Sequence, residues 1–227
     1  MNKKTFYIAG GCSFTMGNEL SDDINGRTLS RKTWAYQLYE KTKYPGAVID
    51  YVNAAHPGSG NQGIARRVFN AVANNKDVGC VIVMWSFLSR YDWAMPRHKE
   101  LEGTRWTSIS PWDTTTGNEE AFRSLSGSET QQEQWRARRD TFAETGVKPF
   151  AEAIYKHAAN QYHETYLSWK SIIWLQNILE KKKIPFMFTL ADNTLFYDEF
   201  KQHKDQDPFM KALHDEIDFT KWFSFGE

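Results

Sequence analysis

The sequence has little cysteine and no excess of charge of either sign. Cys12 and Cys80 are the only cysteines in 227 residues, and both adjoin apolar runs. We expect reduced, buried thiols in a cytosolic setting, with a reactive Cys12 as the alternative. Lysine plus arginine equals aspartate plus glutamate, at 28 each. No overall field therefore favours nucleic acid or an anionic membrane surface.

Several segment types and motifs are also missing. No stretch is long and apolar enough to span a bilayer, and the N-terminal residues do not form a secretory signal, so we expect no membrane partner. The metal motif HExxH and the phosphate loop GxxxxGK are absent. His157 and His163 are six residues apart and do not share a helix face as an i, i+4 pair would. We expect no metal and no cofactor. The basic and aromatic run EQWRARR is weak evidence for nucleic acid in a neutral chain, so none is expected.

Short apolar runs alternate with helical patterns in the first part of the chain. Helices are expected over residues 33–43 and after residue 63, where Ile64, Val68, Ala71 and Val72 share one face. Strands are expected over residues 5–9, 48–55, 78–86 and 184–190. This βαβ rhythm predicts a three-layer α/β/α sandwich with a flavodoxin-like parallel sheet, in a single domain over residues 1–227.

The rhythm stops after the third strand. Residues 91–148 are polar and contain tryptophans, which indicates a long insertion at the mouth of the sheet. Within it, TSISPWDTTTG is typical of a loop and EQWRARRDTFAE of a short helix. The insertion is either a lid or carbohydrate platform, with Trp93, Trp106 and Trp112, or a surface that packs on a partner.

The last third of the chain is mainly helical. Residues 149–183 form a long helical pattern with one possible break, and lysines 181–183 favour its C-terminal end. The apolar stripe expected along it consists of Ile154, Ala158, Tyr162, Tyr166, Trp169, Ile173 and Leu175. One helix is expected near residues 207–216, and no clear fifth strand is visible.

Two glycine-rich segments each follow an expected strand. We call residues 10–17 the first glycine loop and residues 56–63 the second. Ser13 in the first loop is a nucleophile if a base reaches it, or else a helix cap. In the second loop, Ser59 and Gln62 have the spacing of a capping box. Ligands bind at the carboxyl ends of parallel strands, which is where both loops belong.

Polar residues also follow the other expected strands. Ser86 ends the third strand, and Arg90 follows it, either to bind an anionic substrate group or to pair with a carboxylate such as Asp92. Asp192 follows the fourth strand, where it binds substrate, orients a base or caps a turn. His56 begins the second glycine loop and either lines the pocket, serves as base or stabilises the turn.

Two segments resemble blocks of the SGNH (GDSL-like) hydrolases. GCSFT at 11–15 is similar to the nucleophile block, and VNAAHPGSGN at 52–61 to the second block. With the later WS…R element, the chain resembles SGNH-like proteins encoded by bacteriophages. The resemblance implies that Ser13 is the nucleophile of a serine esterase. The backbone N–H groups of Ser13 and Gly58 would then stabilise the oxyanion, and the substrate would be an acyl ester or acetylated carbohydrate.

The later blocks of that family are not matched. Its Gly-x-Asn-Asp block is replaced by MWSFLSR, so Asn61 is a substitute candidate for the oxyanion donor. Its Asp-x-x-His block is absent, since neither His203 nor His214 has aspartate three residues earlier. Two hypotheses follow. One is an SGNH-like acyl hydrolase whose base is a histidine that no motif identifies. The other is a catalytically inactive SGNH-fold protein of a phage, located in the host cytoplasm or virion, with phage structural proteins as partners.

Overall fold

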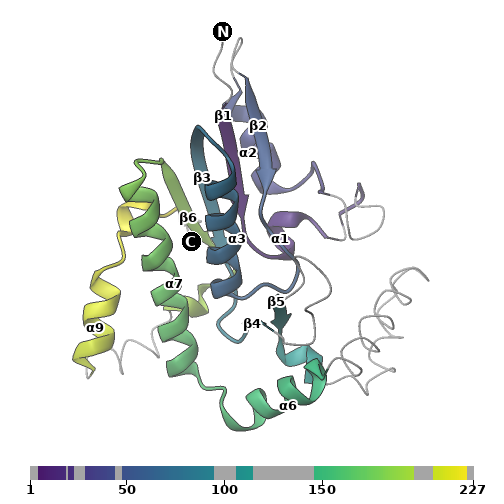
Figure 1. Ribbon diagram of the computed structural model, residues 1–227, viewed down its shortest axis with the longest axis vertical. Coiled ribbons are helices and arrows are strands. Elements are labelled where there is room, and N and C mark those ends of the chain that lie inside the picture. Colours follow the sequence, from purple (N-terminus) through teal and green to yellow (C-terminus); the bar gives the residue numbers. More distant parts are fainter. Residues whose placement is uncertain are drawn as a thin grey trace.

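The protein forms a parallel sheet flanked by helices (Figure 1). The computed structural model describes residues 5–18, 20–22, 29–43, 48–94, 106–114, 146–196 and 207–223. The sheet has four strands in the order β2-β1-β3-β6. Their bounds are β1 Thr5–Gly10, β2 Ile49–Asn53, β3 Val78–Trp85 and β6 Phe186–Leu190, and all neighbours are parallel. This confirms the predicted flavodoxin-like arrangement.

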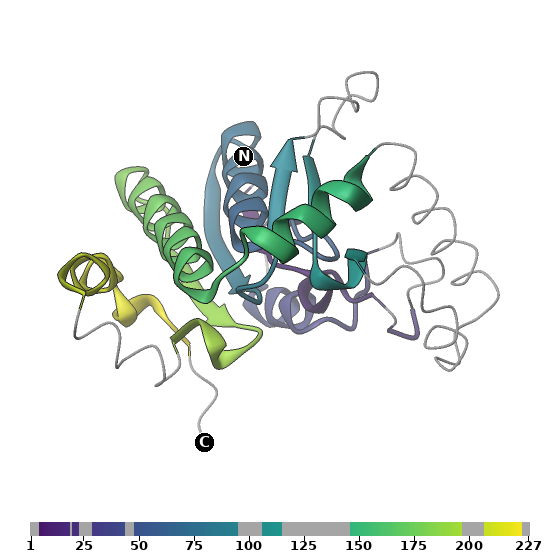
Figure 2. The ribbon, with the colours of Figure 1, turned by 90° about the horizontal axis from the view of Figure 1, so that it is seen from below.

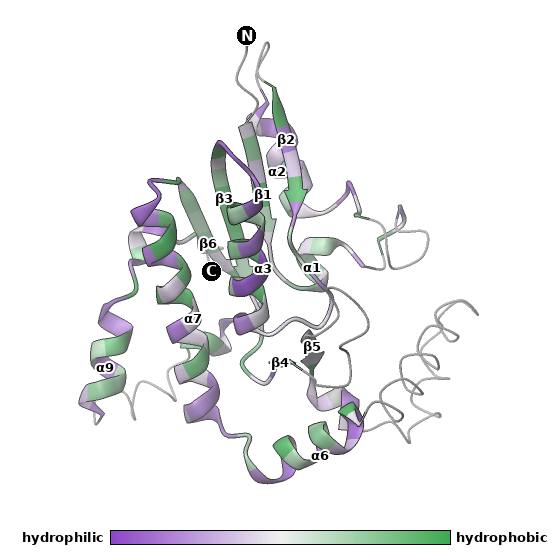
Figure 3. Cartoon of the chain, viewed as in Figure 1, coloured by the Kyte–Doolittle hydropathy of each residue, from purple (hydrophilic) through white to green (hydrophobic). Residues whose placement is uncertain are grey.

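Helices cover both faces of the sheet. Helices α3 (Asn61–Asn74) and α7 (Gln161–Lys181) pack on one face, and α2 (Trp34–Thr42) packs on the other. Successive residues of β1 point to opposite sides, so Ile8 packs against Ile64 of α3 while Tyr7 packs against Tyr39 of α2. Strand β3 is hydrophobic along most of its length (Figure 3), as expected for a strand covered on both faces. The predicted three layers are therefore present.

The long helical pattern is divided once, into α6 (Val147–His157) and α7. Asn160 is the N-cap of α7, where its side chain accepts a hydrogen bond from the His163 N–H at 2.9 Å. The predicted stripe is wrong at Ala158 and Tyr162, which are exposed, and right at Trp169 and Leu175, which are buried. Ile172 and Leu179 complete the buried apolar face of α7. Helix α9 (Pro208–Asp215) occupies the predicted position.

The insertion contributes a small hairpin at the carboxyl edge of the sheet. Strands β4 (Tyr91–Ala94) and β5 (Trp106–Ile109) pair antiparallel and are followed by a 3-10 turn, η2 (Pro111–Thr114). The prediction of a loop is thus wrong at residues 107–109, which pair with β4. The hairpin and α6 lie together beyond the sheet (Figure 2) and share a core of Tyr91, Ile109, Val147 and Ala151. The helix expected at 133–144 and the side chain of Trp112 lie outside the described residues.

The chain returns to the sheet near its C-terminal end. Trp222 forms a parallel bridge with Phe188 of β6, and the Phe223 N–H donates to the Phe188 carbonyl at 2.8 Å. This pairing begins a fifth position next to β6, which sequence patterns did not predict. The short turns η3 (Asn193–Phe196) and η4 (Phe219–Lys221) precede it.

The state of the cysteines and the hydropathy of the helices are both seen in the described residues. Cys12 is buried and Cys80 half-buried, and neither forms a disulfide. Among the described helices, none combines the length and hydropathy needed to cross a membrane.

Candidate functional site

The first glycine loop presents Ser13 at the end of β1. Cys12 is the N-cap of the one-turn helix α1 (Ser13–Met16), so Ser13 is its first residue and not its cap. Gly17, in the left-handed conformation at φ +86°, ends this helix by donating its N–H to the Ser13 carbonyl at 2.7 Å. The Ser13 side chain is half-buried, and its hydroxyl makes no hydrogen bond to any described residue.

The second glycine loop lies beside the first. The Ala54 N–H donates to the Ala9 carbonyl at 2.7 Å, and the His56 N–H donates to the Gly11 carbonyl at 3.1 Å. These bonds continue the pairing of β1 and β2 beyond the strands and join the two loops. Gly58 has φ +73°, a conformation that favours glycine. Within the described ranges, neither the Gly58 N–H nor the Ser13 N–H has an acceptor.

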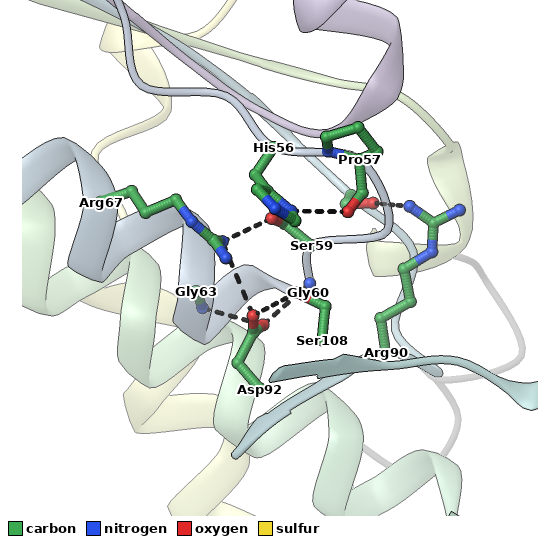
Figure 4. A network of polar contacts seen from close by, with 10 residues as sticks. His56, Pro57, Ser59, Gly60, Gly63, Arg67, Arg90, Asp92 and Ser108 are labelled. Carbon is green, nitrogen blue, oxygen red and sulfur yellow. Dashed lines mark hydrogen bonds and ion pairs between the residues drawn. The ribbon is translucent and has the colours of Figure 1, made fainter. Parts of the chain in front are cut away.

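A buried carboxylate fixes the second glycine loop to the hairpin (Figure 4). Asp92 of β4 is 3% exposed, and its Oδ2 accepts from the N–H groups of Gly60 at 2.9 Å and Gly63 at 3.0 Å. Its Oδ1 accepts from the Ser108 hydroxyl at 2.7 Å. A Cβ on Gly63 would lie 2.1 Å from Asp92 Oδ1, so the close approach requires glycine. Asp92 therefore takes the place of an anion at the N-terminus of α3.

Arg67 completes this network from the second turn of α3. Its Nη1 lies 3.7 Å from Asp92 Oδ1 and donates to the Ser59 hydroxyl at 2.5 Å. Burial raises the pKa of Asp92 above its ordinary value, and the Ser108, Arg67, Gly63 and Gly60 contacts act in the opposite direction. The buried acid is thus compensated by a cation and three donors.

The capping box predicted for Ser59 and Gln62 is wrong. Gly60 is the N-cap of α3 and caps with no side chain, because Asp92 supplies the acceptor from 32 positions away. The signal for such a contact is in the sequence: residues 58–63 read GSGNQG, a G-x-G-x-x-G pattern after a strand and at the start of a helix. That pattern often marks a phosphate site. Here the carboxylate fills the position that a phosphate would need.

Asn61 has a structural position. Its Oδ1 accepts from the Ser86 N–H at 2.7 Å, and its Nδ2 donates to the Ser86 carbonyl at 3.1 Å and the Ser168 hydroxyl at 3.0 Å. Both amide hydrogens are therefore used, and none is left for an oxyanion. The amide instead joins α3, the end of β3 and α7, and this geometry does not support the predicted oxyanion role.

Ser86 and Arg90 lie together after β3. Ser86 is buried, and its hydroxyl accepts from Arg90 Nη1 at 3.0 Å. The alternative pairing of Arg90 with Asp92 is wrong, since Asp92 pairs with Arg67. Arg90 instead stacks on Phe87, with its Cζ 4.6 Å from the ring centroid.

Asp192 lies at the same edge of the sheet. The Ala191 N–H donates to the Trp85 carbonyl at 2.8 Å, which places the end of β6 beside the end of β3. Asp192 Oδ1 accepts from the Thr194 N–H at 2.7 Å, so the side chain caps the turn η3. The structure thus brings Asp192 to the expected edge and gives it the turn role.

His56 is the histidine placed in the glycine loops. Its Nδ1 lies 2.8 Å from the Pro57 carbonyl oxygen, which accepts only, so the proton of the neutral ring is on Nδ1. His214 packs among the rings of Trp169, Phe196 and Phe219. His157 and His163 are exposed on α6 and α7, and His203 lies outside the described residues. No group of three metal-ligating side chains occurs among the described residues.

The tryptophans of the hairpin are partly accessible. Trp93 is 50% exposed and Trp106 42% exposed. Trp93 packs on Phe150 of α6 with ring centroids 5.2 Å apart, and the Arg66 guanidinium lies 4.4 Å from the Trp106 ring centroid. The hairpin therefore offers aromatic surface next to the carboxyl edge of the sheet.

Comparison with known proteins gives similarity only at the level of structure. No protein-family model matches the chain, and no curated protein matches it. Among solved structures, AlinE4, an SGNH-hydrolase family esterase, aligns with 95% of this chain and 75% of its own, at 12% identity and a TM-score of 0.42. An Asp-to-Ala and a Ser-to-Ala variant of that esterase align equally, at 12% and 11% identity.

Proposed function

We propose that the chain is a serine ester hydrolase of the SGNH type in which Ser13 is the nucleophile. One observation carries the proposal. The N–H groups of Ser13 and Gly58 lie in adjacent loops, and neither has an acceptor among the described residues. Such N–H groups at the carboxyl edge of a parallel sheet are suited to a developing oxyanion.

The reaction would proceed by acyl transfer. The Ser13 Oγ attacks the ester carbonyl carbon, its proton passes to a base, and negative charge develops on the carbonyl oxygen. The N–H groups of Ser13 and Gly58 stabilise that charge, each by about 2.7–4 kcal/mol. The ester C–O bond then breaks, the leaving alkoxide takes the proton from the base, and water hydrolyses the acyl-enzyme to restore Ser13.

We assign the base to His56 on two grounds. Its backbone is bonded to Gly11 in the loop that carries Ser13. Its Nδ1 proton is directed to the Pro57 carbonyl, which leaves the basic lone pair on Nε2. Among the described histidines, the other three lie on α6, α7 and α9.

Hydrolysis of p-nitrophenyl acetate, together with labelling by a fluorophosphonate probe, tests the proposal. We expect Ser13→Ala to lower the rate by about 1,000-fold or more, and His56→Gln by a similar factor, because nucleophile and base act as a unit. Peptide mass spectrometry should locate the label on Ser13. Ser21→Ala, which alters an exposed hydroxyl in the following loop, is the matched control and should hydrolyse at the wild-type rate. Equal rates for wild type and Ser13→Ala would remove Ser13 from the mechanism.

A second function, an SGNH-fold interaction protein without catalysis, is favoured by one feature. The Ser13 hydroxyl makes no hydrogen bond to a histidine within the described ranges. In that case the exposed Trp93 and Trp106 would contact a partner, for which a phage structural protein remains our candidate. An unlabelled Ser13 in the folded protein would favour this function over hydrolysis.

A further inference from the structure

Arg90 carries a positive charge that no described acid neutralises. Its Nη1 donates to the Ser86 hydroxyl at 3.0 Å, and its guanidinium stacks on Phe87. The acid nearest to it in sequence, Asp92, is committed to the N-terminus of α3 and to Arg67. No ion pair joins Arg90 to a carboxylate in the described part of the chain. A half-buried cation with neutral partners is typical of a site that receives an anion.

The guanidinium lies at the same edge as Ser13. The Phe87 ring that it covers lies 6.4 Å, centroid to centroid, from the ring of Phe14, the residue that follows Ser13. The Arg90 backbone also lies against the second glycine loop, since a Cβ on Gly60 would be 2.3 Å from the Arg90 carbonyl oxygen. Figure 4 shows the Arg90 side chain extending along this loop. Arg90 therefore contacts the second glycine loop directly and approaches the first through the rings of Phe87 and Phe14.

The position of the guanidinium is fixed before any ligand arrives. Asn61 holds Ser86 through both its backbone N–H and its carbonyl, and Ser86 in turn holds Arg90 Nη1. Phe87 supports the flat face of the guanidinium. Only one N–H of the five is used in a hydrogen bond to a described residue, so an edge of the planar group remains to bind a carboxylate through two bonds.

We propose that Arg90 binds a carboxylate on the acyl part of the substrate, which makes anionic esters the preferred substrate class. The inference rests on the proposed ester hydrolysis at Ser13. A side chain so placed fixes the far end of the acyl group while Ser13 attacks the carbonyl carbon. Arginine is suited to this because its fork matches the two oxygens of a carboxylate, whereas lysine presents a single point charge.

Two substrates of similar acyl length test the proposal: p-nitrophenyl butyrate, which is neutral, and p-nitrophenyl hemisuccinate, which ends in a carboxylate. We expect wild type to prefer the hemisuccinate in kcat/KM. Arg90→Gln should lower kcat/KM for the hemisuccinate by about 10- to 100-fold relative to kcat/KM for the butyrate, with Arg90→Lys in between. Arg31→Gln, at an exposed arginine next to α2, is the control and should keep the wild-type preference. An equal substrate preference in wild type and Arg90→Gln would overturn the proposal.

A binding measurement separates this proposal from the proposed hydrolysis. The backbone N–H resonances of Ser86 and Phe87, which both proteins contain, are followed by NMR while succinate or inorganic phosphate is added to wild type and Arg90→Gln. We expect a saturable shift with succinate in wild type, even if Ser13 proves inactive, and no saturable succinate binding in Arg90→Gln. Tighter binding of phosphate than of succinate would overturn the carboxylate assignment. No saturable binding of either anion would overturn the site altogether.

Discussion

The two glycine loops differ in what holds them. Side chains from α3 and the β4–β5 hairpin fix the second loop, with Asp92 at the centre of the contacts. The first loop is held mainly by backbone hydrogen bonds, and its Ser13 hydroxyl is not engaged by any described residue. A side chain that reacts with a substrate needs hydrogen-bonding groups that no protein partner occupies, whereas a side chain that holds a loop in place has its hydrogen bonds made within the protein. The difference therefore assigns chemistry to the first loop and support to the second.

The largest expected effect on stability comes from disrupting the hydrogen bonds between Asp92 and the start of α3. In Gly63→Ala the new Cβ overlaps the Asp92 carboxylate, which must move and leave two N–H groups without their acceptor. We expect a loss of about 2–4 kcal/mol in the free energy of unfolding, measured with urea. Gly58→Ala is the control, since its nearest neighbour is Ser108 Cβ at 4.0 Å and only φ +73° is unfavourable. It should lose roughly 1–2 kcal/mol. Equal losses would contradict the tight approach of Asp92.

The next effect concerns Asn61. Asn61→Ala leaves the buried N–H and carbonyl of Ser86 without partners, so we expect a loss of about 2–3 kcal/mol in unfolding free energy. Asn74→Ala, near the exposed end of the same helix, should change it by less than about 0.5 kcal/mol. If Asn61→Ala kept full stability and instead abolished hydrolysis, the amide would be an oxyanion donor after all.

A smaller effect should appear as a pH dependence. Because burial raises the folded-state pKa of Asp92 above 3.8, the folded protein binds the Asp92 proton more tightly than the unfolded chain does. Its contribution to stability is full below pH 3.8 and is lost as pH rises through the folded pKa. The unfolding free energy of wild type relative to Asp92→Asn should therefore fall as pH rises from about 3.5 towards neutrality. At Asp215, where the Lys211 hydrogen bond lowers the pKa, the corresponding comparison with Asp215→Asn should have the opposite slope.

The smallest effect is expected at the nucleophile. Ser13→Ala removes a hydroxyl that bonds to no described residue, so the unfolding free energy should change by less than about 0.5 kcal/mol. Urea unfolding of this variant, beside its hydrolysis rate, sharpens the comparison between the loops. A loss above about 1 kcal/mol would mean that the hydroxyl has a structural partner.

Local patterns were sufficient to predict the sheet and its helices. Strands β1 and β3 coincide with continuous apolar runs, and α3 has apolar residues at helical spacing. Such patterns indicate which residues are buried, because the side chains of one strand or helix face the core at regular intervals. The sequence also predicts the break before α7, but it places Ile173 on the apolar stripe instead of the buried Ile172. A pattern with several aromatic residues fits more than one helix face.

The contacts that fix the site are long-range, and the sequence did not predict them. Asp92 lies 32 positions from Gly60, and Asn61 lies 107 positions from Ser168. Ser59 followed by Gln62 has the spacing of a local cap, and the glycine pattern of residues 58–63 does not identify Asp92, on a later hairpin, as the acceptor. Of the predicted edge residues, Ser13, Gly58, Ser86, Arg90 and Asp192 all lie at or next to strand ends.

The hydrogen bonds between Asp92 and the start of α3 couple the movement of the β4–β5 hairpin to that of the second glycine loop. A ligand that displaces the hairpin also displaces the second glycine loop near Gly58, because Asp92 of the hairpin is hydrogen-bonded to the N–H groups of Gly60 and Gly63. A designer who exchanges the hairpin for another sequence must therefore supply a new acid at the same point in space. Without such an acid, the exchanged hairpin would leave the second glycine loop less firmly held.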